Sequence, residues 1–202
     1  MDTEIGRLLA SLPAPEETTV VVMGDNGTER WMIEEPWHRE RRKGTIYEGG
    51  IKVPLIIAGP DVLQPGSESD ALVHAVDLLP TVAALAEVPP SAMADRSYDG
   101  FSLLPWLHEP GSPSARSYLY TEQFEPGGPP PYDTHERVLR SEGWKLVVEQ
   151  KGDSSTETLY ELVPGARDEG DPVAAIGEQT IAGLEELECA MEATLKTLRY
   201  EP

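Results

Sequence analysis

An aspartate and an asparagine stand side by side directly after a short apolar run, and the side-chain oxygens of both can bind hard cations. The stretch reads TTVVVMGDNGTERW, so Asp25 and Asn26 follow the run Val20–Met23. A continuous apolar run of this kind is typical of a strand buried in a parallel sheet, and ligands of such sheets bind beyond the carboxyl ends of the strands. Asp25 and Asn26 are therefore candidate ligands of a divalent cation.

The same two residues also fit a purely structural role. Asn-Gly after β-forming residues is a strong hairpin signal, because both residues tolerate the positive φ of a type I′ turn. The local pattern leaves the two interpretations evenly balanced. The following segment, TERWMIEEPWHRERRKG, does not alternate polar and apolar residues as a returning strand would. This favours a long polar loop after Gly27.

Charge limits the class of partner. The chain has 16 basic and 36 acidic residues and a net charge of −20, which disfavours nucleic acid or an anionic membrane surface. Against this background one dense basic cluster lies just after the acidic-amide pair: Arg39, Arg41, Arg42 and Lys43. Most charge runs face water, but this position also suits the entrance of a site for an anionic substrate.

Hydrophobic periodicity predicts the elements that would position these residues. We expect helices over residues 2–12, 77–86 and 174–198, and buried strands over 18–23 and 51–60, with a brief strand in LVHAV. Strand-like runs in the second half of the chain suit an antiparallel sheet: RSYLYTEQF, RVLRSEGWKLVVEQ and TETLYELV.

These elements predict an α/β fold class. Residues 1–108 should form part of a mixed or parallel sheet flanked by helices, and residues 109–202 a smaller α+β subdomain with an antiparallel sheet and a C-terminal helix. No apolar run reaches the roughly 18 residues of a membrane span, and the start lacks a secretory signal. The single cysteine, Cys189, excludes an internal disulfide, and the lone His74 is expected to be a hydrogen-bonded core residue.

Four stretches in this order and spacing carry a family resemblance: VVVMGDNG, KGTIYEGGIKVPLIIAGP, HAVDLLPTVAALA and YDGFSLLPWL. Together they resemble the C-terminal half of a sulfatase of the arylsulfatase type, within the alkaline-phosphatase superfamily. The resemblance continues through RSEGWKLVV and TLYELV. It implies a hydrolase that acts on an anionic sulfate-ester substrate.

The resemblance assigns roles to three residues. Asp25 and Asn26 match the pair that binds a divalent cation, usually calcium, with magnesium as the alternative. Lys43 matches the catalytic lysine that contacts the sulfate group. The stretch Glu48-Gly49-Gly50 is expected to form a tight turn in which glycine supplies an unusual φ.

The resemblance also implies a nucleophile that this sequence does not contain. Such enzymes use a formylglycine made from cysteine or serine within a C/S-x-P-S-R stretch. GSPSAR, at residues 111–116, lies in the wrong place with one residue too many before the arginine, so we expect a loop there. We therefore expect the N-terminal half, including the true N-terminus, to lie outside this chain, and the chain alone to be inactive and to bind calcium no tighter than millimolar.

Two other interpretations stay open at this point. One is a phosphonate or phosphodiester hydrolase of the same superfamily, and the other is a non-catalytic binding module derived from a sulfatase. The sequence predicts a soluble protein of the cytoplasm or periplasm without deciding between them. It leaves the substrate and the oligomeric state unknown.

Overall fold

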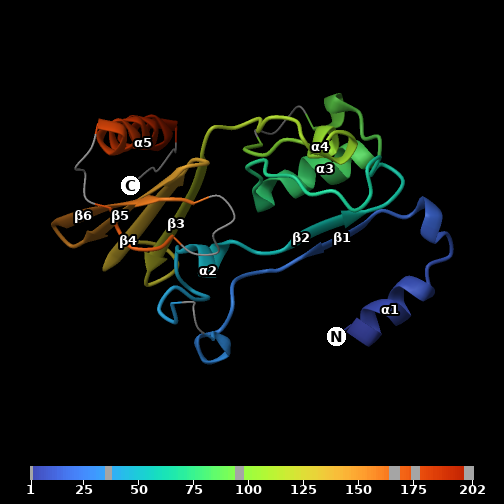
Figure 1. The fold of residues 1–202 in the computed structure, drawn as a ribbon, viewed down its shortest axis with the longest axis horizontal. Helices are drawn as coiled ribbons and strands as arrows, with labels where there is room; N and C mark the ends of the chain where they lie inside the picture. Colours follow the sequence, from blue (N-terminus) through green and yellow to red (C-terminus); the bar gives the residue numbers. More distant parts are fainter. Residues whose placement is uncertain (1, 35–37, 94–97, 164–168, 174–177, 198–202) are drawn as a thin grey trace. The chain divides into compact units, whose positions relative to one another are not determined.

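The computed structural model describes residues 2–34, 38–93, 98–163, 169–173 and 178–197 (Figure 1). The chain packs into two compact units that do not follow chain order. Unit 1 comprises residues 1–23 and 54–115, and unit 2 comprises residues 24–53 and 116–202. The segment that carries Asp25, Asn26 and Lys43 therefore packs with the second half of the chain. The division into domains after residue 108 stays a prediction.

Unit 1 contains a two-stranded sheet and several short helices. In chain order these are α1 (Asp2–Ala10), η1 (Pro15–Glu17), β1 (Val20–Met23), β2 (Leu55–Ala58), η3 (Ala75–Asp77), α3 (Leu78–Leu85), η4 (Pro90–Ala92) and α4 (Leu104–His108). Strands β1 and β2 pair antiparallel, with Val20 opposite Ala58 and Met23 opposite Leu55. Among the described residues, no helix is long and apolar enough to cross a lipid bilayer.

The predicted α/β class is confirmed, but two local expectations for this unit are wrong: the burial of the two strands and the strand in LVHAV. Strands β1 and β2 are only partly buried, because among the described residues each has the other as its one sheet neighbour. LVHAV forms no strand; its last residues begin η3. Helix α1 forms as predicted, yet its apolar face, including Leu8, stays exposed.

A buried aspartate explains why the HAVDLLPTVAALA and YDGFSLLPWL stretches lie together in unit 1. Asp77 accepts hydrogen bonds from the backbone amides of His74, at 2.7 Å, and Phe101, at 3.1 Å. Thr81 extends the link, because its hydroxyl accepts a hydrogen bond from Leu103 N at 2.8 Å. His74 is hydrogen-bonded as predicted, but it is a half-buried helix cap rather than a core residue. These stretches therefore hold the helices α3 and α4 together.

Unit 2 is built on a four-stranded antiparallel meander. The strands are β3 (Leu119–Glu125), β4 (Thr134–Arg140), β5 (Trp144–Lys151) and β6 (Ser154–Glu161), in that spatial order. The remaining elements are η2 (Arg30–Met32), the single turn α2 (Glu48–Ile51) and α5 (Glu178–Thr197). The predicted antiparallel sheet and C-terminal helix are confirmed. The ends of the predicted helix, at 174–177 and 198, lie outside the described residues.

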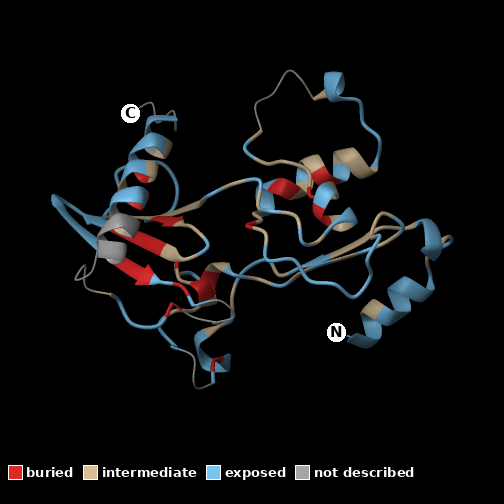
Figure 2. Cartoon of the chain, turned by 45° about the horizontal axis from the view of Figure 1, so that its top comes forward, coloured by how far each residue is buried: buried red, intermediate tan, exposed pale blue. Residues whose placement is uncertain are grey.

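Side chains alternate across the central sheet, so it has two apolar faces. One face packs against α5 through a cluster of buried side chains: Leu139, Leu146, Val148, Leu159, Leu187 and Met191. The opposite face packs against the segment before α2, which inserts Ile46 among Val138, Val147 and Tyr160. Figure 2 shows buried positions in red on the strands of the sheet and on α2, whose buried residues are Glu48 and Gly50. The second face thus carries the segment with the predicted site residues.

Candidate functional site

Asp25 and Asn26 form an exposed bend directly after β1, and they do not form the alternative hairpin. A type I′ turn needs positive φ at both central residues. Among the described non-glycine residues only Glu87 has positive φ, and Gly27 is not among the glycines that do. The strand that pairs with β1 begins at Leu55, far along the chain. The bend is therefore the start of a long loop.

The bend is held in place by hydrogen bonding to the backbone of α2. Gly27 N donates a hydrogen bond of 2.9 Å to Gly50 O. The backbones approach so closely that a Cβ on Gly27 would lie 1.9 Å from Gly49 O. Asp25 Oδ1 accepts from Asn26 N at 2.9 Å, and both side chains are exposed. The pair is thus presented to solvent on a rigid base.

This donor set fits part of a hard-cation site. A carboxylate and an amide oxygen supply two donors, or three if the carboxylate is bidentate, and calcium takes about six to eight. In the described part of the chain, no group of three or more histidine, cysteine, aspartate or glutamate side chains gathers where it could hold a metal. The chemistry of the two donors suits the cation, and the remaining donors would have to come from other groups.

Lys43 lies on the returning part of the same loop. Its backbone N donates a hydrogen bond of 3.0 Å to Thr28 O, so it runs beside the segment that follows Asn26. Its ammonium lies 3.3 Å from Glu29 Oε1, and 43% of its side chain is exposed. Gly44 has a φ of 79°, which a glycine adopts without strain and which lets the chain reverse directly after Lys43.

Residues 41–47, which we name the Lys43 loop, are anchored to the sheet by aromatic and cationic side chains. The Arg41 guanidinium lies 5.2 Å from the Tyr47 ring centroid and 5.4 Å from that of Tyr160. These two tyrosine rings meet edge to face at 6.1 Å. Burial raises the pKa of Tyr160, and a hydrogen bond with Tyr47 raises it further, so Tyr160 stays neutral over the ordinary pH range. Arg41 therefore neither faces water nor lines an entrance.

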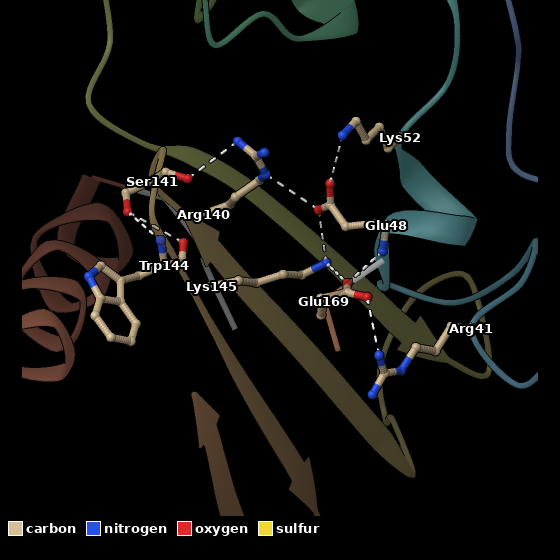
Figure 3. A network of polar contacts seen from close by, with 8 residues as sticks. All are labelled: Arg41, Glu48, Lys52, Arg140, Ser141, Trp144, Lys145 and Glu169. Carbon is tan, nitrogen blue, oxygen red and sulfur yellow. Dashed lines mark hydrogen bonds and ion pairs between the residues drawn. The ribbon is translucent and has the colours of Figure 1, made fainter. Parts of the chain in front are cut away.

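The Lys43 loop adjoins a cluster of buried charges, which Arg41 contacts through Glu169 (Figure 3). Lys145 from β5 has no exposed side-chain area, and its Nζ lies 2.5 Å from Glu169 Oε1 and 3.3 Å from Glu48 Oε1. Arg140 from β4 approaches the same Glu48 oxygen at 3.4 Å. Glu169 is equally buried, and Arg41 lies 3.7 Å from its second oxygen. Two strands, α2 and the segment after β6 thus meet through ion pairs.

The expected role of Glu48-Gly49-Gly50 needs correction. Neither glycine has positive φ; a Cβ on Gly49 would lie 2.0 Å from Arg41 O, and one on Gly50 would lie 2.1 Å from Thr45 O. The glycines are needed for close backbone approach rather than for an unusual φ. Glu48 belongs to the buried cluster, a role that sequence reasoning missed because its partners Arg140 and Lys145 are distant in the sequence.

The residues 111–116, which superficially resemble a nucleophile stretch, form a loop as expected. Ser114 Oγ accepts a hydrogen bond of 2.9 Å from Leu72 N, and Ser112 O accepts one of 3.1 Å from Trp106 Nε1. Both serines therefore serve the packing of unit 1.

Comparisons with known proteins agree on one family. The family model described as Sulfatase matches residues 1–88. Arylsulfatase A of Homo sapiens is 33% identical over 130 residues, which cover 61% of this chain and 25% of that protein. Arylsulfatase K of Gallus gallus is 26% identical over 200 residues, covering 92% of this chain and 34% of that protein.

Solved structures share the fold over nearly the whole chain. BT4656, in complex with its substrate D-glucosamine-2-N,6-O-disulfate, has a TM-score of 0.73 and 25% identity, covering 96% of this chain and 38% of that one. A phosphonate monoester hydrolase from Silicibacter pomeroyi shares the fold with a TM-score of 0.70 at 24% identity. The mixed α/β fold of this chain is thus of the class found in sulfatase structures.

Residues 1–88 of the chain match the sulfatase family model, and the chain is similar to sulfatases in sequence and in fold. It spans about a quarter to two fifths of the length of the relatives described above.

Proposed function

We propose that this chain supplies one part of the active site of a sulfate-ester hydrolase. Similarity to sulfatases supports the reaction class, and one structural observation carries the assignment of residues. The Asp25–Asn26 pair forms an exposed bend on a fixed backbone base, and the loop segment containing Lys43 returns beside it through the hydrogen bond of 3.0 Å from Lys43 N to Thr28 O. A cation site and a cationic side chain are thereby carried by one loop.

Asp25 and Asn26 would hold the divalent cation, calcium by preference and magnesium as the alternative. Both ions favour oxygen donors, and calcium tolerates the irregular geometry that an exposed bend provides. When bound, the cation neutralises negative charge on the sulfate oxygens. The protein's task at this position is to present both oxygens in a fixed place, which the bond from Gly27 to Gly50 does.

Lys43 would contact the sulfate group and neutralise charge as the S–O bond breaks. Removing one such preorganised contact typically costs about 3 kcal/mol of barrier height. Its ion pair with Glu29 does not prevent this role. The pair is partly exposed on both sides, and such pairs contribute only about 0–1 kcal/mol. An incoming sulfate ester can therefore compete with Glu29 for the ammonium.

The nucleophile and the remaining cation ligands would come from residues outside this chain. The printed sequence contains no C/S-x-P-S-R stretch from which a formylglycine could be made. We expect the 202-residue chain alone to show no sulfatase turnover and to bind calcium no tighter than millimolar in calorimetry. Micromolar calcium binding by this chain would contradict a site of two or three donors.

Substitution in a protein that contains this chain together with a nucleophile tests the assignment. Asp25→Ala should abolish turnover of an aryl sulfate while leaving the circular dichroism spectrum unchanged. Asp153→Ala, in the exposed turn between β5 and β6, is the matched control and should leave turnover unchanged. Retained activity in Asp25→Ala would overturn the cation assignment.

The same protein distinguishes sulfate from phosphate chemistry. The fold is shared with a phosphonate monoester hydrolase, so fold alone does not separate the two reactions. We expect a higher kcat/KM on an aryl sulfate than on the matched aryl phosphate, because a dianionic phosphoryl group needs more cationic charge than one lysine and one divalent ion provide. A preference for the phosphate would replace the proposed reaction with the alternative.

A further inference from the structure

We propose that Glu169 is a positioning residue that holds both ends of the Lys43 loop on the central sheet, and that Lys145 fixes Glu169 in place. The clamp itself concerns the folded chain. The role that we assign to it, holding Lys43 and the Asp25–Asn26 bend at a fixed position relative to each other, rests on the proposed function.

One carboxylate joins the two ends of the loop. Glu169 Oε1 accepts a hydrogen bond of 2.6 Å from the backbone N of Glu48, directly after the loop. Glu169 Oε2 lies 3.7 Å from the Arg41 guanidinium, at the start of the loop. The chain between these contacts carries Lys43 and reverses at Gly44. Fixing both ends of so short a segment restricts where its tip can lie.

Lys145 holds the carboxylate at the required place. Lys145 lies on β5, on the face of the sheet opposite α5, and is paired with Tyr160 of β6. Its Nζ donates a hydrogen bond of 2.5 Å to Glu169 Oε1. Neither side chain is exposed. Buried ion pairs of this kind often add little stability compared with apolar residues of the same size. The geometry that the pair imposes is therefore the better reason for its presence.

The clamp extends from the loop to the proposed cation ligands through backbone hydrogen bonds. Glu48 begins α2, and Gly50 of that turn accepts the bond of 2.9 Å from Gly27, next to Asn26. Lys43 N bonds Thr28 O on the other side of the same segment. Loosening the Glu169 contacts should thus loosen both Lys43 and the bend.

Amide hydrogen exchange of the full chain, resolved by NMR, tests this proposal. In Glu169→Leu we expect the amides of Gly27, Lys43 and Glu48 to exchange about tenfold faster or more, relative to the amides of the β4–β5 ladder, because charge-assisted hydrogen bonds are lost. Leu159→Ala is the control: it lies on the α5 face and should speed exchange throughout unit 2 without selecting the loop. A uniform response to Glu169→Leu would overturn the clamp.

A double variant separates positioning from charge balance. Glu169→Leu alone leaves Lys145 buried without its partner at 2.5 Å. Part of the effect of this variant could then be a general loss of stability. Lys145→Met with Glu169→Leu removes both charges and should recover stability in urea. The three loop amides should still exchange fast, because Glu48 N–H lacks its acceptor. Recovered protection of these amides would show that charge balance alone mattered, and would overturn the proposal.

The exchange result is independent of the reaction assigned to the site. If Asp25→Ala retains turnover while Glu169→Leu selectively frees the loop, the proposed function fails and the clamp stands. If Asp25→Ala is inactive while the loop amides respond uniformly, the clamp fails and the proposed function stands.

Discussion

Replacing Lys145 with methionine tests whether the buried charge cluster depends on the ammonium. The substitution keeps an unbranched side chain but removes the contacts to Glu169 at 2.5 Å and to Glu48 at 3.3 Å. Removing one partner of a buried ion pair typically lowers the free energy of unfolding by about 3–5 kcal/mol, since the other charge stays buried without compensation.

The structure places the expected loss at the lower end of this range. After the substitution Glu169 still accepts the bond of 2.6 Å from Glu48 N, and Glu48 still faces Arg140 at 3.4 Å. We therefore expect the free energy of unfolding to fall by about 3 kcal/mol. Domains of this kind have total stabilities of about 5–15 kcal/mol, so such a loss is readily measured.

Lys52→Met is the matched control. Lys52 lies 4.0 Å from the second oxygen of the same Glu48, and 54% of its side chain is exposed. The substitution is chemically identical, and the carboxylate partner is shared, so the two variants differ mainly in burial. An exposed pair contributes about 0–1 kcal/mol, and we expect a change no larger than that.

Urea titration of both variants, followed by circular dichroism, gives the two free energies when the slope m is unchanged. If Lys145→Met loses no more stability than Lys52→Met, the buried cluster does not depend on the lysine charge, and the reasoning from burial is wrong.

The remaining predictions concern the site's backbone base and the acidity of the sheet. Gly27→Ala should lower the free energy of unfolding by about 1–3 kcal/mol, because the new Cβ would lie 1.9 Å from a carbonyl oxygen of α2. Gly111→Ala is the control. A Cβ there has no atom within 4 Å, so the same urea titration should show almost no change in stability. Burial, with repulsion from Glu149 and Glu125, raises the pKa of Glu136. The folded state then holds this proton more tightly than the unfolded state, so parent stability falls as pH rises from the ordinary glutamate pKa through the raised value. Glu136→Gln removes this loss of stability. The variant should therefore have the same urea midpoint of unfolding as the parent in acid and a higher one at neutral pH. A lower urea midpoint at neutral pH would contradict the raised pKa of Glu136.

Local patterns were enough to predict most elements and the position of the proposed ligands. Strand-like runs marked the antiparallel strands of unit 2, and spacing of three and four residues marked α5 through Leu184, Leu187 and Met191. Both signals are local, since each arises from one element facing a core. The apolar run ending before Asp25 likewise placed the acidic-amide pair after a strand. The pattern failed for LVHAV, where a local capping box between His74 and Asp77 favours a helix start.

Only the tertiary structure decided what holds the site loop. Lys145 occupies a strand position whose residue type suggests a solvent-facing side chain, and nothing near it in the sequence supplies a partner. Its carboxylates come from Glu48, 97 residues before it, and Glu169, 24 residues after it. A buried ammonium is tolerated only where such carboxylates converge, and convergence depends on how the sheet, α2 and the segment after β6 pack. Sequence alone thus indicated which groups we propose as cation ligands, while packing of distant segments determined the backbone that supports them.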